Sequence, residues 1–216
     1  MSQHENLRDR IEQHKVKNKY SKKDDKNIKV AADAVLEILK EKYPSHTFTL
    51  NKSLLYKEIE EYSDRKIDEI FKDRKIIPDA GVFWMDNKYP ILIGEAKRQG
   101  TNDERQEEGK KKQATGNAIE RLGKNVLVSK VLFEKETIFP FICFCWGCDF
   151  LDIIVLSKLF GINGLYPTNC FYTDLSNYKA TPFSIFHRLE DWSVSEMVEK
   201  MLFIAENSIR YFENKR

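Results

Sequence analysis

Residues 76–100 read IIPDAGVFWMDNKYPILIGEAKRQG and contain two apolar runs that are bordered by charged side chains. Asp79 stands at the start of the first run, while Glu95 and Lys97 close the second run. Side chains of a strand alternate between its two faces, so Glu95 and Lys97, two residues apart, point the same way. The pattern predicts two neighbouring strands whose ends gather two acids and a lysine.

This set of side chains suits a hard divalent cation next to a phosphate. Mg2+ prefers one or two protein carboxylates together with waters and phosphate oxygens, and Asp79 and Glu95 can supply them, with the backbone carbonyl of Ala96 as a further ligand. Bound Mg2+ polarises a phosphodiester and lowers the pKa of an attacking water, and the Lys97 ammonium would stabilise the charge that develops in the transition state. The alternative is that Asp79 caps a turn after Pro78 while Glu95 and Lys97 form a surface ion pair, since short patterns arise by chance. An unpaired charge at the end of a buried run is energetically costly, so its presence there suggests a functional role. This favours the hypothesis of a nuclease, an enzyme that hydrolyses phosphodiesters.

Residues 110–125 read KKKQATGNAIERLGKN and predict a helix that reads DNA bases. Asn117 and Arg121, four residues apart, share one face of such a helix. Asparagine can pair with adenine N6 and N7, and arginine donates to purine acceptors. Gly116 would permit close approach to a phosphate at the helix start. Small side chains suit thymine methyls and basic ones suit phosphates, and those in this segment are Ala114, Ala118, Lys110, Lys111, Lys112 and Lys124. The alternative is an ordinary amphipathic helix.

Length and composition place the chain among globular proteins. Its 216 residues suit one domain with a substantial core. A net charge of +2 and a pI near 8.2 are almost neutral, so DNA binding must rest on local placement of charge. Apolar runs fall short of the roughly 20 residues of a membrane span, and the charged N-terminus does not resemble a signal peptide. We therefore expect a cytoplasmic protein that does not bind membranes.

The remaining segments predict an α/β fold in which helices outnumber strands and flank a short mixed sheet. Residues 1–27 are rich in charge and are expected to form a mobile arm or a loosely packed helix. Glu58 or Glu61, in the second expected helix, would be a fourth carboxylate at the metal site or, by default, face solvent. Helical spacing or capping signals predict helices over residues 27–43, 52–72, 117–136 and 150–160 and after Ser193. Strands are expected over residues 80–85, 90–97, 139–146 and 170–174, with a turn at Asp86-Asn87 between the first two.

Four cysteines, Cys143, Cys145, Cys148 and Cys170, allow two interpretations. The first three form a C-x-C-x2-C pattern, which is compatible with zinc ligands or disulfide partners. However, they lie in the apolar run FPFICFCWGCDFL, where a free cysteine behaves as a small buried hydrophobe. We expect them to be structural core residues.

Taken together, these segments resemble the EcoRI family of type II restriction endonucleases. The matching segments are PDAGV, ILIGEAKRQG, ATGNAIERLGKN and FPFICFCWGCDFL, and weaker similarity extends over most of the chain. The GNAIER segment that follows an E-A-K strand is more specific than the P-D and E-x-K pattern alone. The resemblance implies a restriction-endonuclease-like fold, a homodimer, and Mg2+-dependent cleavage of both strands of DNA that leaves 5′ overhangs.

The resemblance also assigns roles to individual residues. It gives metal binding to Asp79 and Glu95 and the catalytic lysine role to Lys97. Base recognition is assigned to Gln113, Ala114, Gly116, Asn117, Ala118 and Arg121, with Lys124 among the DNA-binding residues. Cross-subunit contacts are assigned to Glu120 and Arg121.

The implied target is a palindrome with an AATT core, and GAATTC is the leading full site. Gln113 stands where the family has methionine, so the resemblance predicts the inner bases of the target better than the outer pair. A homodimer presents the same side chains to both half-sites, which explains the palindrome. The functional partner would be a DNA adenine methyltransferase of matching specificity. The alternatives are a repair or junction nuclease of the same fold that reads DNA shape, and a catalytically silent DNA-binding module.

Overall fold

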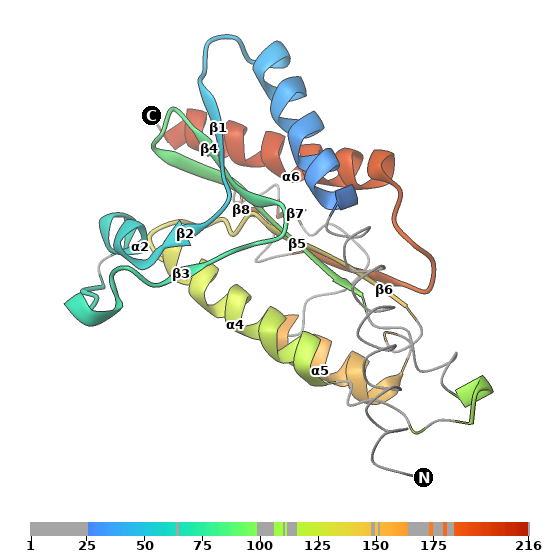
Figure 1. The fold of residues 1–216 in the computed structure, drawn as a ribbon. Helices are drawn as coiled ribbons and strands as arrows, with labels where there is room; N and C mark the ends of the chain where they lie inside the picture. Colours follow the sequence, from blue (N-terminus) through green and yellow to red (C-terminus); the bar gives the residue numbers. More distant parts are fainter. Residues whose placement is uncertain are drawn as a thin grey trace.

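A five-stranded mixed sheet runs through the molecule in the order β1-β4-β5-β6-β9 (Figure 1). Its strands are β1 (Phe48–Asn51), β4 (Gly81–Met85), β5 (Tyr89–Arg98), β6 (Phe141–Trp146) and β9 (Ser184–Arg188). The first three pair antiparallel, and β5, β6 and β9 pair parallel. This computed structural model describes residues 26–63, 65–98, 106–109, 111, 116–147, 150, 152–163, 173–174, 179–180 and 184–215. The sheet and its flanking helices confirm the predicted α/β class.

β4 and β5 form the hairpin that the sequence predicts. Gly81 pairs with Gly94 at one end, and Met85 pairs with Tyr89 at the other. The turn places Asp86 and Asn87 at φ 56° and 51°, which is the left-handed region that these two residue types tolerate best after glycine. β6 is also confirmed as a strand, and all six of its residues are buried.

Helices cover both faces of the sheet (Figure 1). The helix over residues 26–42 and α6 (Val194–Lys215) share one apolar core with the sheet. The other core is shared with α4 (Gly116–Leu132) and α5 (Ile153–Asn163). α6 contacts β5 and β6, while α4 contacts β5 from the opposite side. The central strand β5 is therefore held between two helical layers.

The capping box predicted at the start of α6 is confirmed. Ser193 Oγ accepts a hydrogen bond from the Glu196 N–H at 3.3 Å, and the Ser193 N–H donates to Glu196 Oε2 at 2.9 Å. Arg188, the last residue of β9, donates to Glu196 Oε1 at 2.6 Å. This guanidinium and the Ser193 hydrogen bonds hold the pKa of Glu196 below its usual range. The start of α6 is therefore fastened to the edge strand of the sheet.

The single helix predicted over residues 52–72 is wrong. The segment forms β2 (Leu54–Leu55), which pairs with β3 (Lys75–Ile76), and then α2 (Tyr56–Tyr62) and the one-turn helix η1 (Glu69–Phe71). The extended backbone of Ser63, at ψ 170°, ends α2. Asp68 then caps η1 by accepting from the Ile70 N–H at 3.2 Å. Ile70 is 74% exposed, so its apolar spacing with the earlier residues was not a core stripe.

Other expectations also need correction. The described residues contain nine strands, more than the helices, because β1 and β9 join the sheet and short pairs such as β7 (Thr173–Asp174) with β8 (Lys179–Ala180) add to it. The helix predicted over residues 117–136 was expected to pack its apolar residues, Leu127 among them, on the sheet, but Leu127 is 69% exposed. The arm expected over residues 1–27 lies outside the described residues, except that residues 26–27 already belong to the first helix.

Candidate active site

The candidate site lies where β5 approaches its end next to the loop that leads into β4. Glu95 and Lys97 come from β5, and Asp79 precedes β4 by two residues. The Ala80 N–H donates to the Gly94 carbonyl at 3.0 Å, which sets Asp79 beside Glu95. A Cβ on Gly94 would stand 2.6 Å from the Cβ of Ala80, so this close approach of the loop requires glycine at position 94. The predicted triad is thus brought together.

Three oxygen atoms converge on the ammonium of Lys97. Its Nζ donates to Asp79 Oδ2 at 2.9 Å, to Glu95 Oε1 at 2.7 Å and to the Ala96 carbonyl at 2.9 Å. These three groups are the ones that the sequence nominates as metal ligands. The positively charged Lys97 ammonium therefore lies among the three expected ligands. All three are oxygen atoms, the kind of ligand that Mg2+ prefers.

Further hydrogen bonds fix the two carboxylates. Asp79 Oδ2 accepts from the Ala96 N–H at 3.1 Å, and Glu95 Oε2 accepts from the Asp79 N–H at 2.8 Å. Glu95 Oε1 accepts a second hydrogen bond from Asn125 Nδ2, at 2.5 Å. Asn125 belongs to α4 and is a site residue that was not predicted from the sequence. Its position four residues after Arg121 was the available signal, since both follow one stripe of the helix.

Burial controls the electrostatics of the site. The side chain of Glu95 is only 2% exposed, and that of Lys97 is 14% exposed. Burial raises the pKa of Glu95, and the neighbouring Asp79 adds to this, while Lys97 opposes it. Burial alone would lower the pKa of Lys97, but the carboxylates of Glu95 and Asp79 outweigh it and hold that pKa above its usual range. Lys97 is therefore an ammonium at neutral pH.

The floor of the site is apolar and includes two of the cysteines. Cys143 and Cys145 of β6 pair in register with Glu95 and Lys97. Both thiols are free and buried, as expected for structural core residues, and their sulfurs lie 3.5 Å apart. Burial raises the pKa of Cys143 well above its usual value, so this thiol remains neutral. Cys148 and Cys170 lie outside the described residues.

The predicted DNA-reading segment is described only in part. Gln113 and Ala114 lie outside the described residues, and so do the side chains of Asn117 and Ala118, although the backbone of these two and of Gly116 forms the first turn of α4. The other nominated residues of α4 are exposed, which leaves them open to contact with DNA or with a second subunit; they are Glu120, Arg121 and Lys124.

Neither candidate for a fourth carboxylate contacts the triad in any hydrogen bond or ion pair described here. Glu58 instead accepts from the Leu55 N–H at 2.5 Å and caps α2. Glu61 is exposed. Across the described part of the chain, no group of three or more His, Cys, Asp or Glu side chains is arranged to hold a metal. The two acids of the triad remain the candidate ligands, and two carboxylates suffice for Mg2+.

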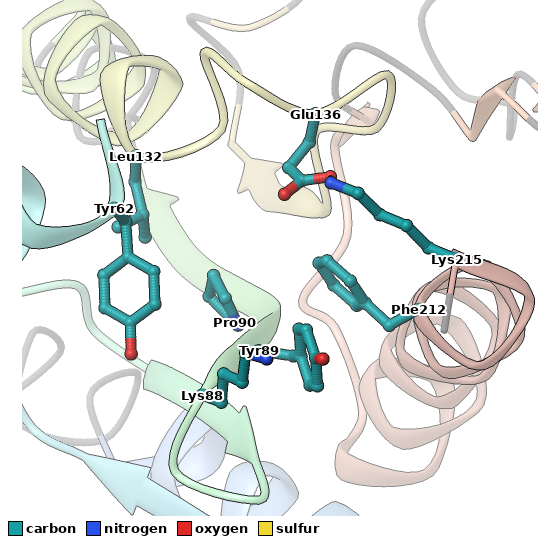
Figure 2. A pocket seen from close by; sticks show the side chains of 8 residues that line it. All are labelled: Tyr62, Lys88, Tyr89, Pro90, Leu132, Glu136, Phe212 and Lys215. Atoms are coloured by element: carbon teal, nitrogen blue, oxygen red, sulfur yellow. The ribbon is translucent and has the colours of Figure 1, made fainter. Parts of the chain in front are cut away.

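A separate cavity of about 320 Å3 opens at the other end of β5. Figure 2 shows its lining, in which the Glu136 and Lys215 side chains point toward each other, and their charged atoms lie 2.6 Å apart. Tyr89 and Phe212 contribute two rings that are tilted by 31° to each other, with centroids 4.8 Å apart. Two of the residues that line the cavity, Tyr89 and Pro90, begin strand β5, whereas Glu95 lies toward the end of that strand. This cavity is therefore distinct from the candidate active site.

Comparisons with known proteins identify the family of the chain. The family model described as restriction endonuclease EcoRI matches residues 12–163, which is more than half of the chain. The chain belongs to the EcoRI restriction endonuclease family. It is also similar to the type II restriction enzyme RsrI of Cereibacter sphaeroides, with 28% identity over 88% of this chain and 85% of the relative. Where the chain is described, none of its helices has the length and apolarity that crossing a membrane requires.

Proposed function

We propose that this chain is a type II restriction endonuclease that uses Mg2+ to cut both strands of DNA at a palindrome with an AATT core, with GAATTC as the leading full site. The proposal rests on three oxygen atoms that surround the Lys97 ammonium. They are Asp79 Oδ2, Glu95 Oε1 and the Ala96 carbonyl. The products would be 5′ overhangs with 5′-phosphates. This goes beyond family membership, because it names the site, the ion and the target.

Asp79, Glu95 and the Ala96 carbonyl would hold the ion. When bound, Mg2+ polarises the phosphate and lowers the pKa of a bound water. Lys97 brings a positive charge that the neighbouring Glu95 and Asp79 carboxylates preserve despite burial, and this charge stabilises the phosphorane-like transition state. Water adds to the phosphorus, the bond to the 3′ oxygen breaks, and that oxygen takes a proton. The Asp79 and Ala96 backbone amides keep both carboxylates in position throughout.

The proposal includes a homodimer. Three large apolar side chains on neighbouring helices α4 and α5 face solvent: Leu127 is 69% exposed, Ile153 75% and Ile154 61%. An apolar surface on adjacent helices supports association with a second subunit. Such a pair would present two copies of α4 to two half-sites of a palindrome. Glu120 and Arg121 would contribute to contacts across the subunits, and we infer that each subunit is a single domain.

Cleavage of phage DNA tests the function. Purified protein with Mg2+ should give discrete fragments, and Ca2+ in its place should support binding without cutting. A smear would instead favour a nuclease of the same fold that reads DNA shape, and no cutting under any ion would favour a silent binding module. Sequencing the fragment ends would give the full site and the overhang. A methyltransferase that modifies adenine in that site, the functional partner that we propose, should then protect the DNA.

A further inference from the structure

Asn125 connects the helix that carries the predicted base-reading residues to the buried carboxylate of Glu95. Its Nδ2 donates to Glu95 Oε1 at 2.5 Å across the interface between α4 and β5. This is a side-chain hydrogen bond from α4 to a member of the triad. We propose that Asn125 is a positioning residue that orients Glu95 for metal binding according to the placement of α4. The inference rests on the proposed function.

The geometry of a helix explains how one stripe of α4 can carry both the predicted base-reading residues and the residue that contacts Glu95. Each step of four residues advances the side chain by roughly 40° around an α-helix with 3.6 residues per turn. The stripe from Asn117 through Arg121 to Asn125 therefore turns gradually around α4. Arg121 is exposed and Asn125 is half-buried, while the next residue, Val126, is 4% exposed in the core. Between Arg121 and Asn125 the stripe therefore passes from the exposed side of α4 to the side that contacts β5.

Glu95 needs such a partner because it has almost no access to water. Its side chain is 2% exposed, and its hydrogen-bond partners come from the Asp79 loop, from Lys97 and from α4. Lys97 and Asn125 share the same oxygen, Oε1. When Lys97 turns toward a phosphate, Asn125 remains as the donor that fixes this oxygen. Without it, a buried acceptor would lose its partner and the carboxylate would be free to rotate.

The hydrogen bond between Asn125 and Glu95 also predicts that the rate of hydrolysis depends on the sequence of the bound DNA. A packed α-helix shifts as one unit, so a displacement of the first turn of α4 on a wrong base pair would also displace Asn125 in the third turn. The Glu95 carboxylate then loses its orientation, and hydrolysis slows even where the DNA is bound. Asn125 would thus add discrimination at the cleavage step to the discrimination provided by base contacts.

Asn125→Leu tests this, because leucine has nearly the shape of asparagine but cannot donate. We expect Mn2+ affinity, measured by electron paramagnetic resonance with DNA bound, and single-turnover cleavage each to fall about 10- to 100-fold, the usual effect of losing a partner of a metal ligand. DNA affinity without metal and the melting temperature should stay near the wild-type values. Asn125→Gln, which keeps the amide, should recover part of both losses. Lys130→Ala, on the exposed side of the same helix, is the matched control and should behave as wild type.

The outcomes separate this inference from the proposed function. If the wild type binds Mn2+ and cuts DNA, and Asn125→Leu does both equally well, Asn125 has no positioning role while the function stands. Equal losses in the leucine and glutamine variants would also reject the hydrogen bond as the cause. If the wild type neither binds Mn2+ nor cuts, both the function and the inference are overturned.

Discussion

Replacing Gly94 with alanine should disrupt the active site from within the sheet. The added Cβ would lie 2.6 Å from the Cβ of Ala80, whereas carbon atoms pack best at about 3.5–4.0 Å. The loop before β4 must therefore retreat by roughly 1 Å. Asp79 adjoins Ala80, so its 2.9 Å contact with Lys97 would lengthen toward 3.9 Å, which is no longer a hydrogen bond.

The cost follows from the same geometry. Overpacking of this kind costs about 1–3 kcal/mol, which corresponds to a melting temperature lower by about 2–12 °C for a chain of this size. Misplacing a catalytic group by about 1 Å can slow the reaction about 100-fold. Differential scanning fluorimetry and single-turnover cleavage of a DNA duplex would measure the two effects.

Two further variants make this test specific. Met201 Cε and Ile142 Cγ2 stand at ordinary distances of 3.7 and 3.8 Å from the added Cβ, so Ala80 is the main obstacle. Adding Ala80→Gly to Gly94→Ala should restore most of the activity. Gly161→Ala in α5, where a Cβ would meet no atom within 4 Å, should cut normally and melt at the same or a higher temperature. Wild-type melting and cleavage by Gly94→Ala would refute the reasoning.

Three other substitutions address the remaining parts of the proposal. Lys97→Ala should bind DNA in Ca2+ but cut at least about 100-fold more slowly, since it lacks the charge at the phosphate; cleavage at the wild-type rate would remove Lys97 from the mechanism. Asn117→Ala should lose about 1–3 kcal/mol of discrimination at one adenine, measured by competition binding, and full-rate cutting of the same sequence would show that the recognition assignment is wrong. Ile154→Asp should shift the protein toward monomer in sedimentation experiments, while Val30→Asp, a similarly exposed change on a different helix, should leave the mass unchanged.

The convergence of Asp79, Glu95 and Lys97 at the candidate site was predictable from sequence because its signals are local. Glu95 and Lys97 share a strand face by simple alternation, and a charged pair at the end of a buried strand is unusual enough to suggest function. Asp79 follows from the hairpin, whose turn residues were recognisable. The position of Asn125 required knowing how α4 is rotated against β5, and a single sequence does not contain that angle.

The errors in the predicted secondary structure also arise where the outcome depends on tertiary contacts or on a few local residues. β1 has four residues and an alternating pattern too short to distinguish from a loop, so its pairing with β4 depends on the rest of the sheet. Residues 52–72 have apolar side chains at helical spacing, but helix α2 ends at Ser63 and the separate helix η1 is capped by Asp68. Val126 and Leu127 are both apolar, so the sequence alone does not separate them, but they lie roughly 100° apart on α4 and only Val126 is buried.

Mn2+ binding tests the central claim most directly, because carboxylate sites for Mg2+ also accept Mn2+. Paramagnetic resonance would count the ions bound by the protein–DNA complex in the wild type, in Asp79→Asn with Glu95→Gln, and in Glu61→Gln as the control with an exposed acid. We predict that the wild type and the Glu61 variant bind Mn2+ alike and that the double variant loses this binding. Undiminished Mn2+ binding by the double variant would contradict the assignment of the site.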